Sequence, residues 1–445
     1  MTALLPPDPA QWQAVRADAV ADRLSPAAHW YFASEWIALD STLQRSTPFW
    51  LAAPLRLRQQ QLQLAPLALQ APGSDDTIPL ALVPPLSSNP VYVNHDTLLY
   101  LSQRPLRVRA EPIGEQLRAR TLWPEDWRLD TDATPLLGDW RQLIGCGEAG
   151  AQQPFRCQAL WQRASDQRSV PRWVLGFMLN GAQGDDDEAH AGHYALVLGR
   201  WREDGDIADW LVANFYNPDV VSEKGILPAL VPMDNYLADL NSGQQQYRPS
   251  WLVACAFADE TIASAVYTQL LATLERVYDH RLHYQHTDLN CTGLCMDALR
   301  AAGIRVPMGG PSSRLLAPIL YASTLLRDRS PTEARKAIRY LLAEKTRLMP
   351  WLAFEASVTY LLSLLTGSAG DVVDNRTVVE RALVNQATAL YGMHFPQLPS
   401  ARPWGREPAF SLFDYQNRVP KKRANWKIIP VPARAFPAAL AGSDR

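Results

Sequence analysis

The sequence predicts an α+β fold, in which a central antiparallel sheet carries helices and is flanked by a β-rich N-terminal region and an all-α C-terminal region. Four short runs in the middle of the chain are rich in β-branched and aromatic residues and are bounded by turn-forming residues. Apolar residues recur at helical spacing after these runs and in the last third of the chain. The 445 residues, 47% of them hydrophobic, suffice for roughly two to three domains with ordinary cores.

The N-terminal region, residues 1–145, is rich in tryptophan and proline. Its first part, Ala10–Leu43, is expected to be helical. Short apolar runs broken by prolines follow and indicate β-strands. These runs are Ile78–Val83, Val91–Val93 and Leu98–Leu101. No sequence motif in this region indicates a chemical function.

The middle region, residues 146–310, is expected to contain the sheet. Its four strands are predicted at Arg172–Leu179, His193–Leu198, Asp209–Tyr216 and Ser250–Phe257. Thr261–Asp279 follows with apolar residues at helical spacing, which predicts a helix packed against the sheet.

The third region, residues 311–445, is expected to be an accessory helical unit with an irregular tail. Ser330, Pro331 and Glu333 supply a cap, a first-turn proline and a first-turn acid for a helix over Thr332–Lys345. Two more helices are predicted near Trp351–Leu365 and Val372–Tyr391. The tail after Pro396 is rich in proline and arginine.

Charge and composition exclude several classes of protein. The chain has 43 basic and 45 acidic residues, so it lacks the basic excess of a nucleic-acid-binding protein. The N-terminus has no basic segment followed by an apolar one, so a cytoplasmic location is the default, with export without a signal peptide as the alternative. Ala356–Gly370 is shorter than the about 20 apolar residues of a membrane span. It predicts a buried helix, with contact along a membrane surface as the alternative.

The five cysteines are odd in number and sparse, so they do not form a disulfide framework. Cys291 stands at the predicted start of a helix that either Asp288 or Asn290 caps and Gly303 ends. The positive end of the helix dipole lowers the pKa of a thiol there, and the Cys291 N–H is directed toward any carbonyl that the sulfur attacks. Cys295, one turn later, is expected to belong to the core.

A thiol nucleophile needs a base and a group that orients the base. His193 opens an apolar strand, which fixes its backbone and places its imidazole at the end of the sheet. Asn214 in the next strand shares a face with Val212 and is the candidate orienting group, with Asp209 as the substitute if the strand register differs.

Two of these segments resemble a known superfamily. The stretch from Gly192 to Gly199, Gly-His-Tyr-Ala-Leu-Val-Leu-Gly, resembles the histidine strand of NlpC-type cysteine peptidases. Asn290-Cys291, followed by a helix that ends in Ala-Ala-Gly-Ile, resembles the nucleophile helix of the same papain-like superfamily. The order, histidine before cysteine, resembles the circularly permuted branch with the lecithin:retinol acyltransferase-like proteins. The resemblance covers about residues 170–305 and implies a papain-like fold with Cys291 as nucleophile, His193 as base and Asn214 as third residue.

The expected function is therefore a cysteine hydrolase that cleaves an amide, such as a cell-wall peptide bond, or an ester through an acyl-enzyme, without a cofactor. The alternatives are a lipid acyltransferase and a non-enzymatic binding or structural protein on a papain-like scaffold. A metal-dependent hydrolase is a further alternative, but the spacing of His280, His283 and His286 suits one ion poorly on either a helix or a strand. His286 is also an alternative base. The acidic run Asp185–Glu188 is interpreted as a solvated loop, with binding of calcium or of a cationic substrate as the alternatives.

Overall fold

The structure is a computed structural model. It describes the backbone of six N-terminal strands, the single residues 96 and 100, and most of the chain beyond them. The later described ranges are 126–144, 150–164, 169–182, 190–215, 228–238, 248–278, 281–282, 284–287, 289–367, 375–400 and 403–420.

A seven-stranded sheet forms the centre of the molecule. Its strand order is β11-β10-β9-β8-β12-β13-β7, and every neighbouring pair is antiparallel. The strands are β7 (Arg156–Gln162), β8 (Trp173–Asn180), β9 (His193–Arg200), β10 (Leu211–Asn214), β11 (Ala229–Pro232), β12 (Ser250–Phe257) and β13 (Ala387–Phe395). The predicted α+β class with an antiparallel sheet is confirmed.

Both faces of this sheet are covered, which explains why its central strands are apolar runs without a polar face. Every residue of β8 and β12 is buried, and so is every residue of β9 except the last. One face packs against helices and includes Tyr194, Leu196 and Cys291; we call this the helix-side core. The other face packs against Trp127, Trp210 and α5, and we call it the opposite core.

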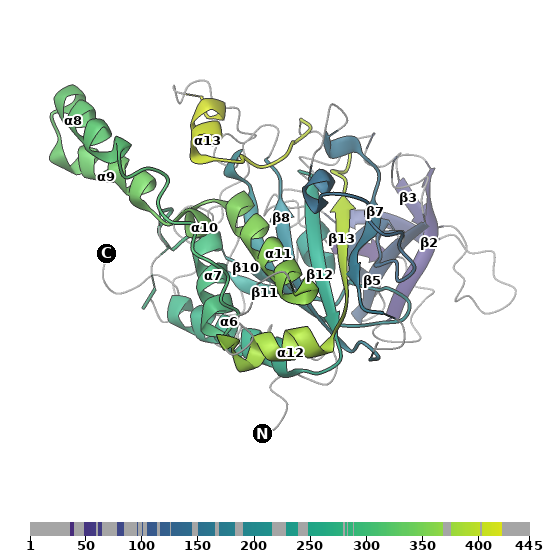
Figure 1. The fold of residues 1–445 in the computed structure, drawn as a ribbon. Helices are drawn as coiled ribbons and strands as arrows, with labels where there is room; N and C mark the ends of the chain where they lie inside the picture. The colour runs from purple at the N-terminus through teal and green to yellow at the C-terminus, as the bar shows by residue number, and fades with distance from the viewer. Residues whose placement is uncertain are drawn as a thin grey trace, which may run out of the picture.

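Four helices contribute to the helix-side core: α6 (Thr261–Tyr278), α7 (Cys291–Ala301), α11 (Pro350–Thr366) and α12 (Val378–Gln386). Figure 1 shows α7 and α11 crossing in front of the sheet. The short helices are α5 (Met233–Ala238), α10 (Lys345–Leu348) and α13 (Leu412–Arg418), with 3-10 turns at Trp140–Leu143 and Gly150–Gln152. Helices α8 (Leu316–Asp328) and α9 (Pro331–Leu342) form a hairpin that projects from the body (Figure 1).

The prediction of an all-α region over residues 311–445 is wrong at one element. The predicted helix over Val372–Tyr391 ends at Gln386, and Ala387 begins β13, which lies between β12 and β7. All nine residues of β13 are buried. Glycine suits position 392 because it has no Cβ, and a Cβ there would lie only 2.4 Å from Leu143 Cδ1. Pairing with two neighbouring strands, a tertiary effect, outweighs the local helical pattern.

The six N-terminal strands form a closed barrel of order β1-β4-β3-β2-β5-β6. They are β1 (Trp36–Leu39), β2 (Phe49–Arg58), β3 (Gln61–Leu64), β4 (Ile78–Val83), β5 (Pro105–Ile113) and β6 (Gln116–Pro124). The predicted strand Ile78–Val83 is confirmed. The helix predicted over Ala10–Leu43 is wrong at Trp36–Leu39, because these residues pair with β4 and β6. The rest of that segment, Val91–Val93 and most of Leu98–Leu101 lie outside the described residues.

No helix in the described part of the chain combines the length and the apolar character needed to cross a membrane.

Candidate functional site

Cys291 is the first residue of α7, and Asn290 is its N-cap. The Asn290 side chain accepts a hydrogen bond from Gly293 N at 2.8 Å and donates to the carbonyls of His286 and Leu348 at 2.9 and 3.1 Å. Of the two caps considered from the sequence, Asn290 is therefore the cap, while Asp288 lies outside the described residues. At the other end, Gly303 has a φ of 97° and ends the helix as predicted.

The Cys291 side chain is buried, with 6% of the residue exposed. Its sulfur lies 3.8 Å from Thr292 Oγ1. Its backbone N–H, which was expected to face a substrate carbonyl, instead donates a hydrogen bond to Tyr284 Oη at 3.2 Å. An oxyanion would have to displace the tyrosine hydroxyl to use this donor.

The thiols of α7 form hydrogen bonds with the part of β9 that is not paired with its neighbour β10. The β9–β10 pairing includes only Leu198 with Leu211 and Val197 with Val212. Nearer the start of β9, a hydrogen bond from the Tyr194 backbone reaches the Cys291 sulfur. The Cys295 thiol donates to Tyr194 O at 3.9 Å. The two cysteines, one helical turn apart, therefore form hydrogen bonds with backbone groups of Tyr194 that β10 does not reach.

Burial raises the pKa of the Cys291 thiol above its ordinary value, and the hydrogen bonds from Tyr194, Thr292 and Tyr284 oppose this only in part. Burial likewise raises the pKa of Cys295, which lies in the helix-side core as expected. The position at a helix N-terminus favours a lower thiol pKa. In this site the cost of burying a thiolate is the larger effect, so Cys291 is a protonated thiol at neutral pH.

His193 opens β9 directly after Gly192, whose φ is 86°. A Cβ on Gly192 would lie 2.5 Å from Asn180 O and 2.7 Å from Pro408 Cβ, so only glycine fits there. The His193 imidazole is buried. Burial, and then the charge of Arg248, lower its pKa to about 3, while a hydrogen bond with the Asn214 side chain acts in the opposite direction. The imidazole is therefore neutral at neutral pH.

Asn214, the last residue of β10, lies beside His193, as predicted. It shares a face with Val212, and Val212 belongs to the opposite core. Extending the register of β9 and β10 places Asn214 diagonally across from His193 on the same face, within reach of a side chain. Asp209 precedes Leu211, which pairs with Leu198, so it lies toward the far end of β9 from His193.

The thiol and the imidazole lie at the same end of β9 but on opposite faces of the sheet. Tyr194 points into the helix-side core together with Cys291. Because side chains alternate along a strand, His193 points with Ala195 to the opposite core. The structure therefore brings His193 and Asn214 together, and it places Cys291 against the backbone of the residue next to His193.

Four polar residues near His193 were not predicted from the sequence: Asn180, Tyr236, Arg248 and Ser250. Asn180, which pairs with His193 across β8 and β9, donates to Ser250 Oγ at 2.7 Å and accepts from Tyr236 Oη. Arg248 donates to Gly181 O at 3.1 Å. All four are buried. Asn180 and Ser250 each stand at the end of an apolar run, and this position is the signal that identifies them in the sequence.

The histidine cluster is only partly described. His280 and His283 lie outside the described residues, as does the acidic run Asp185–Glu188. His286 is exposed, and its ring stands edge-on to Tyr284 with 5.5 Å between the centroids. Within the described ranges, no three His, Cys, Asp or Glu side chains are grouped so that they could hold a metal ion.

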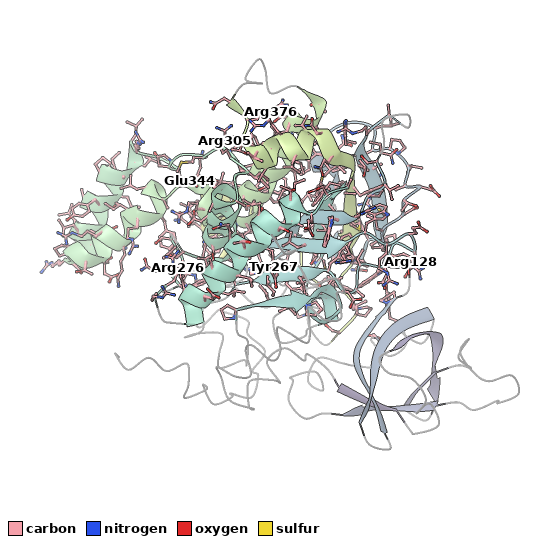
Figure 2. All side chains as sticks on the ribbon, turned by 90° about the horizontal axis from the view of Figure 1, so that it is seen from below. Arg128, Tyr267, Arg276, Arg305, Glu344 and Arg376 are labelled. Carbon is pink, nitrogen blue, oxygen red and sulfur yellow. The ribbon has the colours of Figure 1, made fainter. Side chains whose placement is uncertain are left out.

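The far end of α7 is tied to α12 by a buried carboxylate. Glu380 accepts hydrogen bonds from Arg305 N at 2.9 Å, from Arg305 Nη2 at 3.0 Å and from Thr377 N at 2.9 Å. Arg305 lies near Arg376 at this end of the molecule (Figure 2). Thr377 Oγ1 also donates to Gly303 O at 2.6 Å. The bonds from Arg305 to Glu380 and from Thr377 to Gly303 join the segment that follows α7 to the start of α12.

Comparisons of this chain with protein-family models, curated proteins and solved structures found no match.

Proposed function

We propose that the sheet with α7 is a papain-like domain and that the protein is a cysteine hydrolase acting on an amide, such as a peptide bond, or on an ester. Cys291 is the nucleophile, His193 the base and Asn214 the group that orients the base. The observation that carries the proposal is that the Cys291 sulfur bonds to the backbone of Tyr194, immediately next to the His193–Asn214 pair. The Cys291 sulfur and the His193–Asn214 pair lie at the same end of β9, on opposite faces of the sheet.

The protonation states fit general-base catalysis rather than a preformed ion pair. The imidazole is neutral, because its pKa is about 3, and the thiol is protonated, because burial raises its pKa. Because His193 and Cys291 lie on opposite faces of the sheet, the reaction requires the imidazole to turn about its Cα–Cβ bond, past the part of β9 that is not paired with β10. Asn214 orients the ring before this turn. The His193 ring nitrogen then takes the thiol proton as sulfur bonds to the carbonyl carbon.

The remaining steps follow from the first. The imidazolium gives its proton to the leaving amine or alcohol, and the bond from the carbonyl carbon to that group breaks, which leaves a thioester on Cys291. Water then attacks the thioester while His193 takes a proton from it, and the sulfur leaves with a proton from the imidazolium. The products are a carboxylic acid and the free enzyme. An alcohol or amine in place of this water makes the same protein an acyltransferase.

A second function is favoured by a specific observation. Both α7 sulfurs bond to the backbone of β9, and burial raises the pKa of both thiols. Cysteines with these properties are usually structural. A non-enzymatic binding or structural protein on the same scaffold has no need for a reactive Cys291, and its contacts with a partner lie elsewhere.

The experiment that separates the two functions is acylation of the intact protein by a small activated ester, p-nitrophenyl acetate. We expect an acetyl group on the Cys291 peptide by mass spectrometry and none in Cys291→Ala. His193→Ala should slow acetylation by about 10²- to 10⁴-fold, as expected for loss of a general base. Asn214→Ala should slow it less.

Cys295→Ala is the matched control, because it removes a thiol from the same helix without removing the nucleophile. It should be acetylated at Cys291 at the rate of the unaltered protein. A folded protein in which Cys291 stays unmodified, or is modified equally fast without His193, contradicts the hydrolase and supports the scaffold.

A further inference from the structure

The projecting hairpin of α8 and α9 has its large apolar side chains on the outside. Leu315, Leu316, Ile319 and Leu326 are 86%, 54%, 65% and 81% exposed. The buried residues of α8 are the small Ala317 and Thr324. A helix that only packs against its own protein has the reverse pattern, with large apolar residues inward. The pattern therefore indicates that something else covers this surface.

The exposed residues form one surface and not scattered positions. Leu315, Ile319 and Leu326 are separated by four and seven residues, so they lie on one face of the helix, and Leu316 borders them. We call these four residues the outer face of α8. Figure 1 shows the hairpin extending away from the sheet and its covering helices. Single exposed leucines are ordinary, but a contiguous row on a projecting element marks an interaction surface.

The charges around the outer face have one predominant sign. Residues 314–342 contain six basic and two acidic side chains, a net charge of +4 in a chain whose net charge is -2. The stretch 315–326 is uncharged, with Arg314 directly before it and Arg327 and Arg329 after it. The two acidic residues are held in ion pairs, Asp328 with Arg327 at 2.8 Å and Glu333 with Lys336 at 2.9 Å.

We propose that the outer face of α8 docks onto an anionic phospholipid surface. The four apolar side chains enter the boundary between headgroups and acyl chains, and the arginines at both ends of the stretch reach lipid phosphates. The uncharged stretch is about 18 Å long as a helix, whereas the hydrocarbon core is about 30 Å thick. The helix therefore lies along the surface and does not span the bilayer.

The same charges disfavour a second copy of this chain as the occupant. If two α8 helices pack in parallel, Arg314 meets Arg314 of the other copy. If they pack antiparallel, Arg314 meets Arg327 and Arg329. Either arrangement sets like charges against each other at the ends of the apolar contact, which is unfavourable. An anionic lipid surface complements the positive charges at both ends of the uncharged stretch.

The test is flotation of the full chain with two kinds of vesicle, phosphatidylcholine alone and phosphatidylcholine mixed with phosphatidylglycerol. We expect stronger binding to the mixed vesicles, weakened by added salt. The triple substitution Leu315→Ser, Ile319→Ser and Leu326→Ser should lower the partition coefficient by more than about tenfold. Leu326→Ser alone should lower it less. Arg314→Gln with Arg329→Gln should weaken binding to the mixed vesicles only.

Leu137→Ser is the control, because Leu137 is 88% exposed but lies outside the hairpin. It should leave binding unchanged. The proposal is overturned if the unaltered chain does not float with mixed vesicles, or if the triple variant floats equally well. It is also overturned if light scattering shows a dimer that the triple variant dissociates, because a second copy then occupies the outer face. The readout is lipid binding, so it is independent of the proposed hydrolase activity.

Discussion

The Cys291 thiol is hydrogen-bonded to the backbone of Tyr194, on the edge of β9 that β10 leaves unpaired. The sulfur therefore sits inside the sheet–helix interface, and burial raises its pKa. We expect iodoacetamide to modify Cys291 slowly at neutral pH, with an apparent pKa above the about 8.5 of a free thiol. Peptide mass spectrometry across a pH series measures this rate. Rapid modification near pH 7 would show that the thiol is ionised despite its burial.

The low pKa of His193 makes stability depend on pH. The unfolded chain binds a proton at His193 below about pH 6.5, but the folded chain does so only near pH 3. The contribution of the neutral, buried ring is therefore fully present above pH 6.5 and is lost progressively as the pH falls toward 3. We expect His193→Gln to lose less stability than the unaltered protein between pH 7 and pH 4, measured by urea unfolding.

His394 provides an internal reference for this comparison. Burial lowers its pKa to about 4, and it is present in both proteins. The contribution of His394 to the pH dependence is therefore the same in both proteins and cancels when their unfolding free energies are subtracted. Parallel pH profiles for the two proteins would mean that His193 is protonated equally easily in the folded and unfolded chains.

Local patterns predicted the elements that carry the site. The strand Ser250–Phe257 and the α7 start at Cys291 match the structure, because an apolar run and a cap are read from neighbouring residues. The proximity of Asn214 to His193 was also predicted, since a two-residue period fixes which side chains share a face. The sequence did not predict that His193 faces away from Cys291. That relation depends on which face of the sheet α7 packs against, which is a tertiary property.

The difference between local pattern and tertiary contact also explains why β13 was predicted as part of a helix. Ala387–Phe395 directly follows a helix and contains helix-forming residues, so its local pattern extended the predicted helix. It becomes a strand because β12 and β7 both pair with it. Those partners lie more than a hundred residues earlier in the chain, beyond any local pattern.

Asn290 is expected to matter more for the stability of α7 than an ordinary cap. Its side chain makes three hydrogen bonds, one as the acceptor for Gly293 N and two as the donor to the carbonyls of His286 and Leu348. Asn290→Ala should destabilise the protein by about 2 kcal/mol, the upper part of the range for a lost cap. Urea unfolding followed by far-ultraviolet circular dichroism measures this change.

Asn290→Asp distinguishes the two roles of the side chain. Aspartate keeps the cap acceptor but cannot donate to the two carbonyls. We expect it to destabilise the protein as well, because the carboxylate faces carbonyl oxygens in a buried position. An aspartate variant as stable as the original would show that only the cap bond to Gly293 contributes.

The Glu380 carboxylate should stabilise the attachment of α7 to α12 at pH values at which it is ionised. Burial opposes its ionisation, but hydrogen bonds from Arg305, Tyr360 and Thr377 hold its pKa at about 2. Glu380→Gln keeps the shape and removes the charge, and we expect a loss of about 2 kcal/mol in unfolding free energy at pH 7. The folded pKa lies below the unfolded value of 4.5, so this contribution is present above pH 4.5 and disappears as the pH falls toward 2.

The difference between Glu380→Gln and the unaltered protein should therefore narrow in acid, which urea unfolding at several pH values can measure. Glu333→Gln is the matched control, because it also neutralises a carboxylate in an ion pair, but an exposed one. Its effect should be small at every pH, since exposed ion pairs contribute about 0 to 1 kcal/mol. Equal effects of the two substitutions would mean that burial of Glu380 among its donors adds nothing, and that α12 is held to α7 by apolar packing alone.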